Sequence, residues 1–209
     1  SGIGNSVLWT TNGGTSWESE TTGSDYGLYS VYLISQTTAI VCGTSETILK
    51  TTDNGNSWTT VNSGSISNLY SIDFVNDSIG YCVGNGGMIL KTTNSGDIWN
   101  PQNSGSFNWL SDVEFYNSDF GYAVGYMGTC LNTTNGGTDW TTQQSNTERW
   151  LNSISIKSGT AAIADGEYGT TITTTNSGSN WNVISAGTTN PLYSIKFFDL
   201  NTGFISGDF

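Results

Sequence analysis

Five of the tryptophans in the chain stand 41 residues apart, and each one ends a box of eight residues with the pattern Thr-x-Asn/Asp-x-Gly-x-x-Trp. The boxes read TTNGGTSW, TTDNGNSW, TTNSGDIW, TTNGGTDW and TTNSGSNW, and their tryptophans are Trp17, Trp58, Trp99, Trp140 and Trp181. A constant period between about 20 and 50 residues is typical of solenoids, propellers and repeat arrays. The repeat therefore restricts the chain to an architecture made of stacked, similar units.

Each repeat predicts four short strands. The 41-residue spacing also holds for leucines that begin an apolar, alternating segment, at Leu28, Leu69, Leu110, Leu151 and Leu192. A second apolar segment follows, a third leads into the box, and a fourth begins at the tryptophan, while helical periodicity is absent. Four strands of about five residues are the content of one propeller blade.

The ends of the chain predict how the blades close. The sequence begins with the third and fourth strands of a repeat and stops after the first and second. Pairing these strands would complete one more blade and remove exposed sheet edges. We therefore expect an all-β, five-bladed propeller forming a single domain over residues 1–209. Its blades cover about 28–60, 69–101, 110–142 and 151–183, with a composite blade of 192–209 and 1–19.

The box itself is interpreted as a structural hairpin. Tight turns need residues that tolerate positive φ, which the box supplies at Gly14, Gly55, Gly96, Gly137 and Gly178. A side-chain oxygen two residues earlier can accept backbone N–H groups of the turn, from Asn12, Asp53, Asn94, Asn135 and Asn176. The tryptophan is then expected to cover the hairpin and bury its apolar face.

Composition excludes several classes of function. The chain has no histidine, so imidazole catalysis and histidine metal ligands are ruled out. A net charge of -12, with Arg149 as the only arginine, disfavours nucleic acid and anionic membranes. No segment is apolar enough to span a bilayer, and no leader peptide is recognised. Cys42, Cys82 and Cys130 are expected to be buried free thiols.

Abundant Thr, Ser, Asn and Gly with few lysines favour an extracellular or cell-surface protein, and a chain that begins with Ser1 suggests a module of a longer protein or a surface assembly.

The box resembles the Asp box of sialidase-type (BNR) repeats. Together with GYCVGNGGMILKTTNSGDIW and GYAVGYMGTCLNTTNGGTDW, it is similar to the propeller repeats of photosystem II assembly-factor-like proteins. The resemblance covers essentially the whole chain and implies a propeller. Sialidases bind their substrate with three arginines, so this activity is excluded. The resemblance implies more blades and a basic face for the photosystem factor, so we expect that its assembly role does not transfer.

A candidate ligand-binding site lies in the loops that precede the first strands and those that join the second and third strands, which gather on one face of a propeller. Two neighbouring repeats enrich these loops in large side chains: Phe107, Trp109, Tyr126, Met127, Arg149, Trp150, Glu167 and Tyr168. Other repeats place Gly27, Asn68 or Pro191 where Trp109 and Trp150 stand. These two tryptophans either form a stacking platform, with two ring faces about 10 Å apart, or plug the channel mouth.

The predicted function is a non-enzymatic module for protein–protein interaction, with a glycan-binding module as the alternative. A glycoside hydrolase is a third possibility, because Asp73, Asp112 and Glu114 lie on innermost strands, and Asp112 and Glu114 share one strand face. Oxygen-rich boxes could attract calcium, but they lack several carboxylates per loop. We expect no metal and no cofactor.

Overall fold

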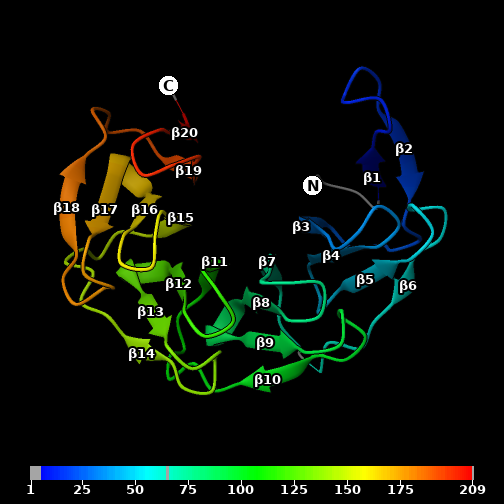
Figure 1. Cartoon of the computed structure of the whole chain (residues 1–209), viewed down its shortest axis with the longest axis horizontal. Helices are drawn as coiled ribbons and strands as arrows, with labels where there is room; N and C mark the ends of the chain where they lie inside the picture. Colours follow the sequence, from blue (N-terminus) through cyan, green and yellow to red (C-terminus); the bar gives the residue numbers. More distant parts are fainter. Residues whose placement is uncertain (1–5, 65, 209) are drawn as a thin grey trace. The chain divides into compact units, whose positions relative to one another are not determined.

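The computed structural model describes residues 6–64 and 66–208 and contains, within them, twenty strands and three short 3₁₀ turns (Figure 1). The three turns, η1 (Asn85–Gly87), η2 (Tyr126–Gly128) and η3 (Glu167–Gly169), each join the second strand of a sheet to the third. The chain is all-β, as predicted.

The strands form four four-stranded sheets and two two-stranded sheets, and strands that follow one another in the sequence are neighbours in each sheet. The first two complete sheets comprise β3 (Leu28–Leu33), β4 (Ala39–Gly43), β5 (Ile48–Thr51) and β6 (Thr59–Thr60), and then β7 (Leu69–Phe74), β8 (Gly80–Gly84), β9 (Ile89–Thr92) and β10 (Asn100–Gln102). The next two comprise β11 (Leu110–Phe115), β12 (Gly121–Gly125), β13 (Cys130–Thr133) and β14 (Thr141–Thr142), and then β15 (Leu151–Ile156), β16 (Ala162–Gly166), β17 (Thr170–Thr174) and β18 (Asn182–Ser185).

The two remaining hairpins are β1 (Ser6–Trp9) with β2 (Glu18–Thr21), and β19 (Leu192–Phe197) with β20 (Gly203–Gly207). They are the half-repeats at the two ends of the sequence. Four complete sheets and two half-sheets are consistent with a five-bladed propeller that has a composite blade from both ends of the chain. The pairing of the two half-sheets with each other stays a prediction.

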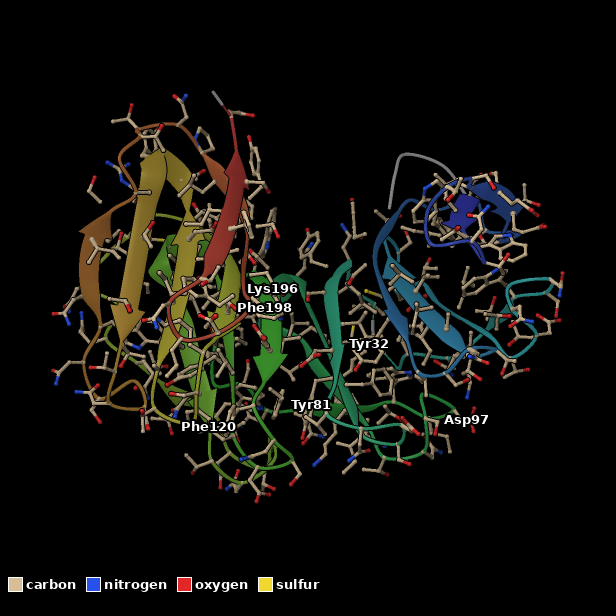
Figure 2. All side chains as sticks on the ribbon, turned by 45° about the horizontal axis from the view of Figure 1, so that its top comes forward. Tyr32, Tyr81, Asp97, Phe120, Lys196 and Phe198 are labelled. Atoms are coloured by element: carbon tan, nitrogen blue, oxygen red, sulfur yellow. The ribbon has the colours of Figure 1, made fainter. Side chains whose placement is uncertain are left out.

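The described residues divide into two compact units. The first contains the residues up to Cys82 together with Leu90–Pro101, and the second contains Val83–Ile89 together with the residues from Gln102 onward. In the first unit, the hydroxyl group of Tyr32 on β3 donates to the carbonyl oxygen of Phe74 on β7, at 2.9 Å (Figure 2). This bond joins two strands whose residues are one repeat apart.

The core follows from the burial of the second strand in each complete sheet. All residues of β4, β8, β12 and β16 are buried, because these strands have hydrogen-bonded neighbours on both sides and apolar side chains on both faces. In the second unit, the Tyr122 ring of β12 meets the Trp181 ring edge-on, with centroids 5.4 Å apart. The three cysteines are buried free thiols, as predicted.

The box hairpins have the predicted hydrogen bonds. The Asn or Asp oxygen accepts the backbone N–H group four residues later in all five boxes, at 2.9–3.0 Å. The φ angle of the box glycine lies between 79° and 87°. A further contact was not anticipated: the hydroxyl oxygen of the first threonine accepts the N–H group of that glycine, for example from Gly96 to Thr92 at 3.0 Å.

The tryptophans of the boxes are not equally buried. Trp99, Trp140 and Trp181 are buried, and Trp99 and Trp140 meet Phe74 and Phe115 edge-on. Trp58 is half-buried, whereas Trp17 is 59% exposed. The expectation of a covered apolar face is therefore wrong for Trp17. Its ring lies near Gly14 of its own box but belongs to a two-stranded half-sheet, which offers less surface to pack against than a complete sheet.

Candidate functional site

The loops that precede β11 and β15 meet the turns η2 and η3 in the second unit. The backbone N–H group of Tyr126 donates to the carbonyl oxygen of Trp109 at 2.9 Å, and that of Glu167 donates to the carbonyl oxygen of Trp150 at 3.0 Å. Each bond ties the residue before a first strand to the turn that follows the second strand of the same sheet. The sequence-predicted residues are therefore brought together in the way that the repeat implies.

Three aromatic rings of these loops form one cluster. Trp109 and Trp150 have centroids 5.7 Å apart and planes inclined by 71°, and Tyr126 meets Trp150 at 5.4 Å and 82°. Edge-to-face contacts of this kind place the positive edge of one ring against the negative face of another. The expected platform of two separate faces about 10 Å apart is therefore wrong, because the two indoles pack on each other.

A pocket of about 420 Å³ opens at this cluster and is lined by Phe107, Asn108, Trp109, Tyr126 and Trp150. Phe107 is 94% exposed and Trp109 is 43% exposed. The indole N–H group of Trp150 instead donates to the hydroxyl oxygen of Ser111 at 2.5 Å, and its ring is half-buried. Trp150 is thus the anchored member of the pair, and Trp109 presents more of its surface to solvent.

Arg149 and Tyr168 form a second pair in the same unit, outside the lining of the aromatic pocket. The guanidinium carbon of Arg149 lies 4.3 Å from the centroid of the Tyr168 ring, which is a cation–π contact. Of the predicted residues, Phe107, Trp109, Tyr126 and Trp150 therefore line one pocket, while Arg149 and Tyr168 stack nearby in the chain. Glu167 contributes the backbone bond to Trp150 described above.

Two bulky side chains in these turns have a backbone conformation that usually favours glycine. Met127 has φ of 54° and Tyr168 has φ of 56°, whereas the same position in η1 is Gly86. A large residue at positive φ costs about 1–3 kcal/mol, and such residues occur preferentially at functional sites. Met127 and Tyr168 are 54% and 62% exposed, so burial does not compensate for this strain. We call Phe107, Trp109, Tyr126, Met127, Trp150 and Tyr168 the aromatic surface.

The carboxylates considered for catalysis make structural bonds. On β11, Asp112 accepts the hydroxyl group of Ser153 at 3.0 Å and the N–H group of Ile154 at 2.9 Å. Glu114 accepts the N–H group of Ile156 at 3.2 Å and pairs with Lys196 at 2.6 Å. Burial raises the pKa of Glu114, and the Lys196 ammonium group opposes this shift. The shared strand face of these two side chains joins β11 to β15 rather than opening to a substrate.

Asp73, the third of these carboxylates, lies on β7. In the described part of the chain, no three Cys, Asp or Glu side chains come together as a metal-binding group.

Sequence analysis missed Asp165 on β16. Its side chain is fully buried, and its two carboxyl oxygens have no well-formed hydrogen bond within the described residues. Burial, followed by the negative charge of Asp112, raises the pKa of Asp165 to about 7, although backbone N–H groups of Ser153 and Asp165 partly oppose the shift. The hydroxyl oxygen of Thr171, which lies opposite Asp165 in the β16–β17 register, is also buried without a partner in that part of the chain.

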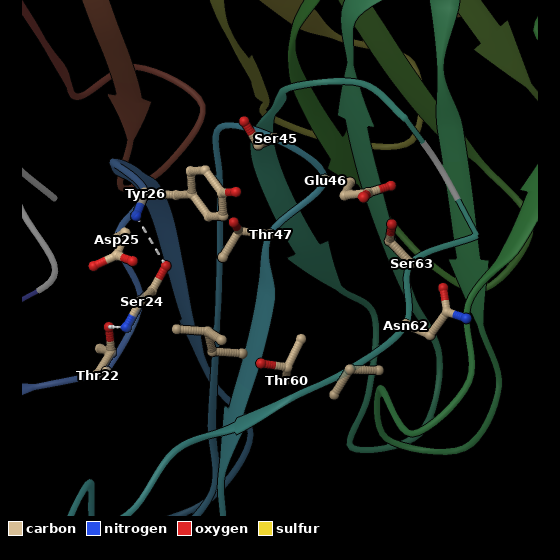
Figure 3. A pocket seen from close by; sticks show the side chains of 13 residues that line it. Thr22, Ser24, Asp25, Tyr26, Ser45, Glu46, Thr47, Thr60, Asn62 and Ser63 are labelled. Carbon is tan, nitrogen blue, oxygen red and sulfur yellow. Dashed lines mark hydrogen bonds between the residues drawn. The ribbon is translucent and has the colours of Figure 1, made fainter.

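A second pocket, of about 530 Å³, lies in the first unit (Figure 3). Its lining is mainly polar and includes Asp25, Tyr26, Glu46 and several hydroxyl groups. Glu46, with φ of 59°, stands where the later repeats carry Gly87, Gly128 and Gly169. A Cβ atom at any of those glycines would collide with the backbone of the following loop. The missing glycine is therefore the sequence signal by which this difference between repeats could have been found.

Comparisons with known proteins agree with the repeat. The family model described as Photosynthesis system II assembly factor YCF48 matches residues 3–93 and 92–192. No curated protein sequence matches the chain. Within residues 6–64 and 66–208, no helix has the length and apolar character needed to cross a bilayer.

Three solved structures are similar in fold. YCF48 from Cyanidioschyzon merolae has 16% identity and a TM-score of 0.76, over 97% of this chain and 71% of that one. YCF48 bound to D1 peptide has 16% identity and a TM-score of 0.69, over 87% of this chain and 60% of that one. An ancestral GH74 enzyme has 18% identity and a TM-score of 0.75, over 93% of this chain but 30% of the enzyme. Identities this low show the fold alone, and the chain spans 60% of the length of the D1-peptide complex protein.

Proposed function

Because the chain belongs to the Photosynthesis system II assembly factor YCF48 family, we propose that it is a non-enzymatic recognition module that binds a segment of a partner protein at the aromatic surface. The family match does not test our expectation that the photosystem assembly role itself fails to transfer. The proposal concerns the kind of ligand, a polypeptide segment, and the residues that contact it.

The observation that carries this proposal is the exposure of large side chains that the fold does not require. Gly27, Asn68 and Pro191 occupy the position of the two tryptophans in other repeats, and Gly86 occupies that of Met127 and Tyr168. Aromatic residues exposed around a pocket are typical of the centre of protein interfaces, where they contribute most of the binding energy. A similar structure, YCF48 bound to D1 peptide, supports a peptide as the class of ligand.

Panning a displayed library of random peptides against the purified chain tests the proposal. We expect selected peptides whose affinity falls about tenfold or more in the Trp109→Ala variant, as for hot-spot truncations. Tyr116→Ala is the matched control, since Tyr116 is 53% exposed and directly follows the opposite end of β11. Failure to select any peptide, or equal losses in both variants, would contradict binding at the aromatic surface.

A glycan ligand is the alternative, and the exposed part of Trp109 favours it because a sugar ring can stack on one indole face. A glycan array probed with the chain and with Trp109→Ala distinguishes the two. Saccharide binding that depends on Trp109, without peptide selection, would replace the protein ligand by a glycan.

We also propose an extracellular or cell-surface location, on the basis of a composition rich in Thr, Ser, Asn and Gly and poor in lysine. Protease treatment of intact cells that produce the native protein is the test. Loss of the protein under conditions that spare a cytoplasmic marker is expected, and complete protection would contradict the proposed location.

A further inference from the structure

The basic side chains of the second unit are already engaged by neighbours. Lys196 pairs with Glu114 at 2.6 Å, and Lys157 lies 4.8 Å from the centroid of the Phe197 ring. Arg149 stacks on Tyr168 at 4.3 Å. Glu148 and Glu167 flank Arg149 and Trp150 in the sequence, and neither forms an ion pair in the described part of the chain. Acidic groups without a matching cation therefore border the aromatic surface.

The aromatic pocket also offers an acceptor and no cation. The hydroxyl group of Thr129 donates to the carbonyl oxygen of Tyr126 at 2.6 Å, so its oxygen accepts the amide N–H group of Asn108 at 2.8 Å. This arrangement uses the amide nitrogen of Asn108 and leaves the amide oxygen as the acceptor of this side chain. The remaining lining consists of Phe107, Trp109, Tyr126 and Trp150, whose ring faces carry the negative part of the aromatic quadrupole.

We propose that the segment bound at the aromatic surface is cationic, and that a lysine or arginine side chain of the partner enters the aromatic pocket. The inference rests on the proposed function and adds the charge of the ligand to it. The net charge of -12 attracts such a segment over a longer range, and Glu148 and Glu167 act close to the pocket. The stacking of Arg149 on Tyr168 shows, within the same surface, the contact that a guanidinium group makes with an exposed ring.

A matched set of labelled peptides tests the charge. The peptides share their apolar residues and length and differ only in carrying Lys, Gln or Glu at the variable positions, and fluorescence anisotropy measures their affinity for the intact chain. We expect the Lys peptide to bind about tenfold more tightly than the Gln peptide, with a further loss for the Glu peptide, and the difference to shrink in high salt.

Charge variants make the test independent of folding defects in tryptophan variants. The Glu148→Gln, Glu167→Gln double variant should weaken binding of the Lys peptide about threefold or more and leave the Gln peptide unchanged. The control is Asp119→Asn with Asp139→Asn, which removes the same charge next to the box hairpin of the same sheet, at the other end of β12.

The two proposals fail in different ways. Equal affinities for the Lys and Glu peptides, or equal effects of the two double variants, would overturn the cationic ligand while leaving peptide binding intact. Absence of binding by all three peptides and by every peptide of the panned library would overturn both proposals.

Discussion

At the scale of single residues, Asp165 is the side chain whose surroundings differ most from its chemistry. The other complete sheets carry Cys42, Val83 and Val124 at this position, and all of them are buried. The strands packed against β16 are β15, β17 and β19, and Lys196 on β19 is the one charged residue among their sequences, with its ammonium group on Glu114. Asp112 is the carboxylate whose charge reaches Asp165.

The raised pKa of Asp165 gives stability a definite pH dependence. Because the folded pKa, about 7, exceeds the ordinary value of 3.8, the folded state binds the proton more tightly than the unfolded state does. The contribution is fully present below the unfolded pKa and is lost as the pH rises through the folded pKa.

Asp165→Val should remove this dependence. We expect the variant to gain about 2 kcal/mol in the free energy of unfolding at pH ~8, where the parent buries a charge, and much less at pH ~4. Urea unfolding at both pH values measures this, with exposed Asp139→Asn as the control. An unchanged slope against pH in Asp165→Val would contradict the assignment.

Trp109 and Trp150 should differ in what they contribute to stability. Trp109→Ala removes a ring that is 43% exposed and should cost about 1 kcal/mol of unfolding free energy, whereas Trp150→Ala also loses the bond to Ser111 and should cost about 3 kcal/mol. Thermal and urea unfolding of both single variants compare them. A cost of about 3–5 kcal/mol for Trp109→Ala would show that it, too, is a plug.

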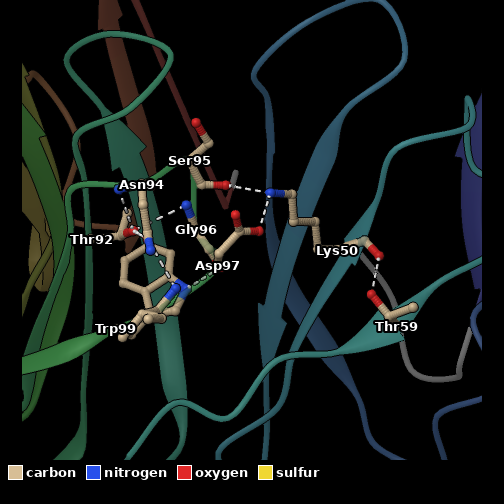
Figure 4. A network of polar contacts seen from close by, with 9 residues as sticks. Lys50, Thr59, Thr92, Asn94, Ser95, Gly96, Asp97 and Trp99 are labelled. Atoms are coloured by element: carbon tan, nitrogen blue, oxygen red, sulfur yellow. Dashed lines mark hydrogen bonds and ion pairs between the residues drawn. The ribbon is translucent and has the colours of Figure 1, made fainter.

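At the scale of strands and hairpins, sheets in the first unit are joined by polar contacts that sequence spacing did not reveal. Lys50 on β5 donates to the carbonyl oxygen of Ser95 at 2.9 Å and pairs with Asp97 at 2.6 Å, in the next box hairpin (Figure 4). The Lys50 side chain is 11% exposed and that of Asp97 is 63% exposed. Because one partner is in water, the carbonyl bond and the packed lysine stem contribute more than the ion pair does.

Lys50→Met should therefore destabilise more than Asp97→Asn. We expect about 1–2 kcal/mol for Lys50→Met, which leaves the Ser95 carbonyl group without its donor, and less than about 0.5 kcal/mol for Asp97→Asn. Urea unfolding measures both, with exposed Lys157→Met as a control for loss of a lysine. Equal effects of Lys50→Met and Asp97→Asn would show that the ion pair dominates instead.

At the scale of the whole molecule, the two half-sheets expose residues that the complete sheets bury. Phe204 on β20 is 79% exposed, whereas Tyr81 and Tyr122 at the same position are at most 1% exposed. Leu8 on β1 is 60% exposed, whereas Leu49 at the same position is 4% exposed. The apolar pattern of a complete blade is thus present in two halves, which favours their union.

A disulfide between the half-sheets tests this union. Val41 lies opposite Leu49 in the β4–β5 register, so the same register would place Ile205 opposite Leu8. Leu8→Cys with Ile205→Cys should form an intramolecular disulfide under mild oxidation, seen as a shifted monomer band on a non-reducing gel, while the native cysteines stay buried. Either single variant is the control. Disulfide-linked dimers without the shifted monomer would contradict closure within one chain.

The sequence alone determined the features that depend on contacts within a single repeat. The box hairpins were predicted down to the accepting oxygen and the positive φ of the glycine, because every group that forms them lies within eight consecutive residues. The number and order of strands followed from the same repetition. The residues of the aromatic surface were also found, because loops at equal positions of neighbouring repeats must lie side by side.

Only the tertiary structure decided what happens between residues that are one repeat or more apart. Whether the two indoles face a ligand or each other, and whether the Asp112 carboxylate is open or bonded to β15, depends on how neighbouring sheets pack. The same holds for the burial of Asp165 and for the pocket beside Glu46. A periodic sequence specifies equal backbone positions, but the contacts of each side chain depend on the adjacent repeat, whose residues at those positions differ.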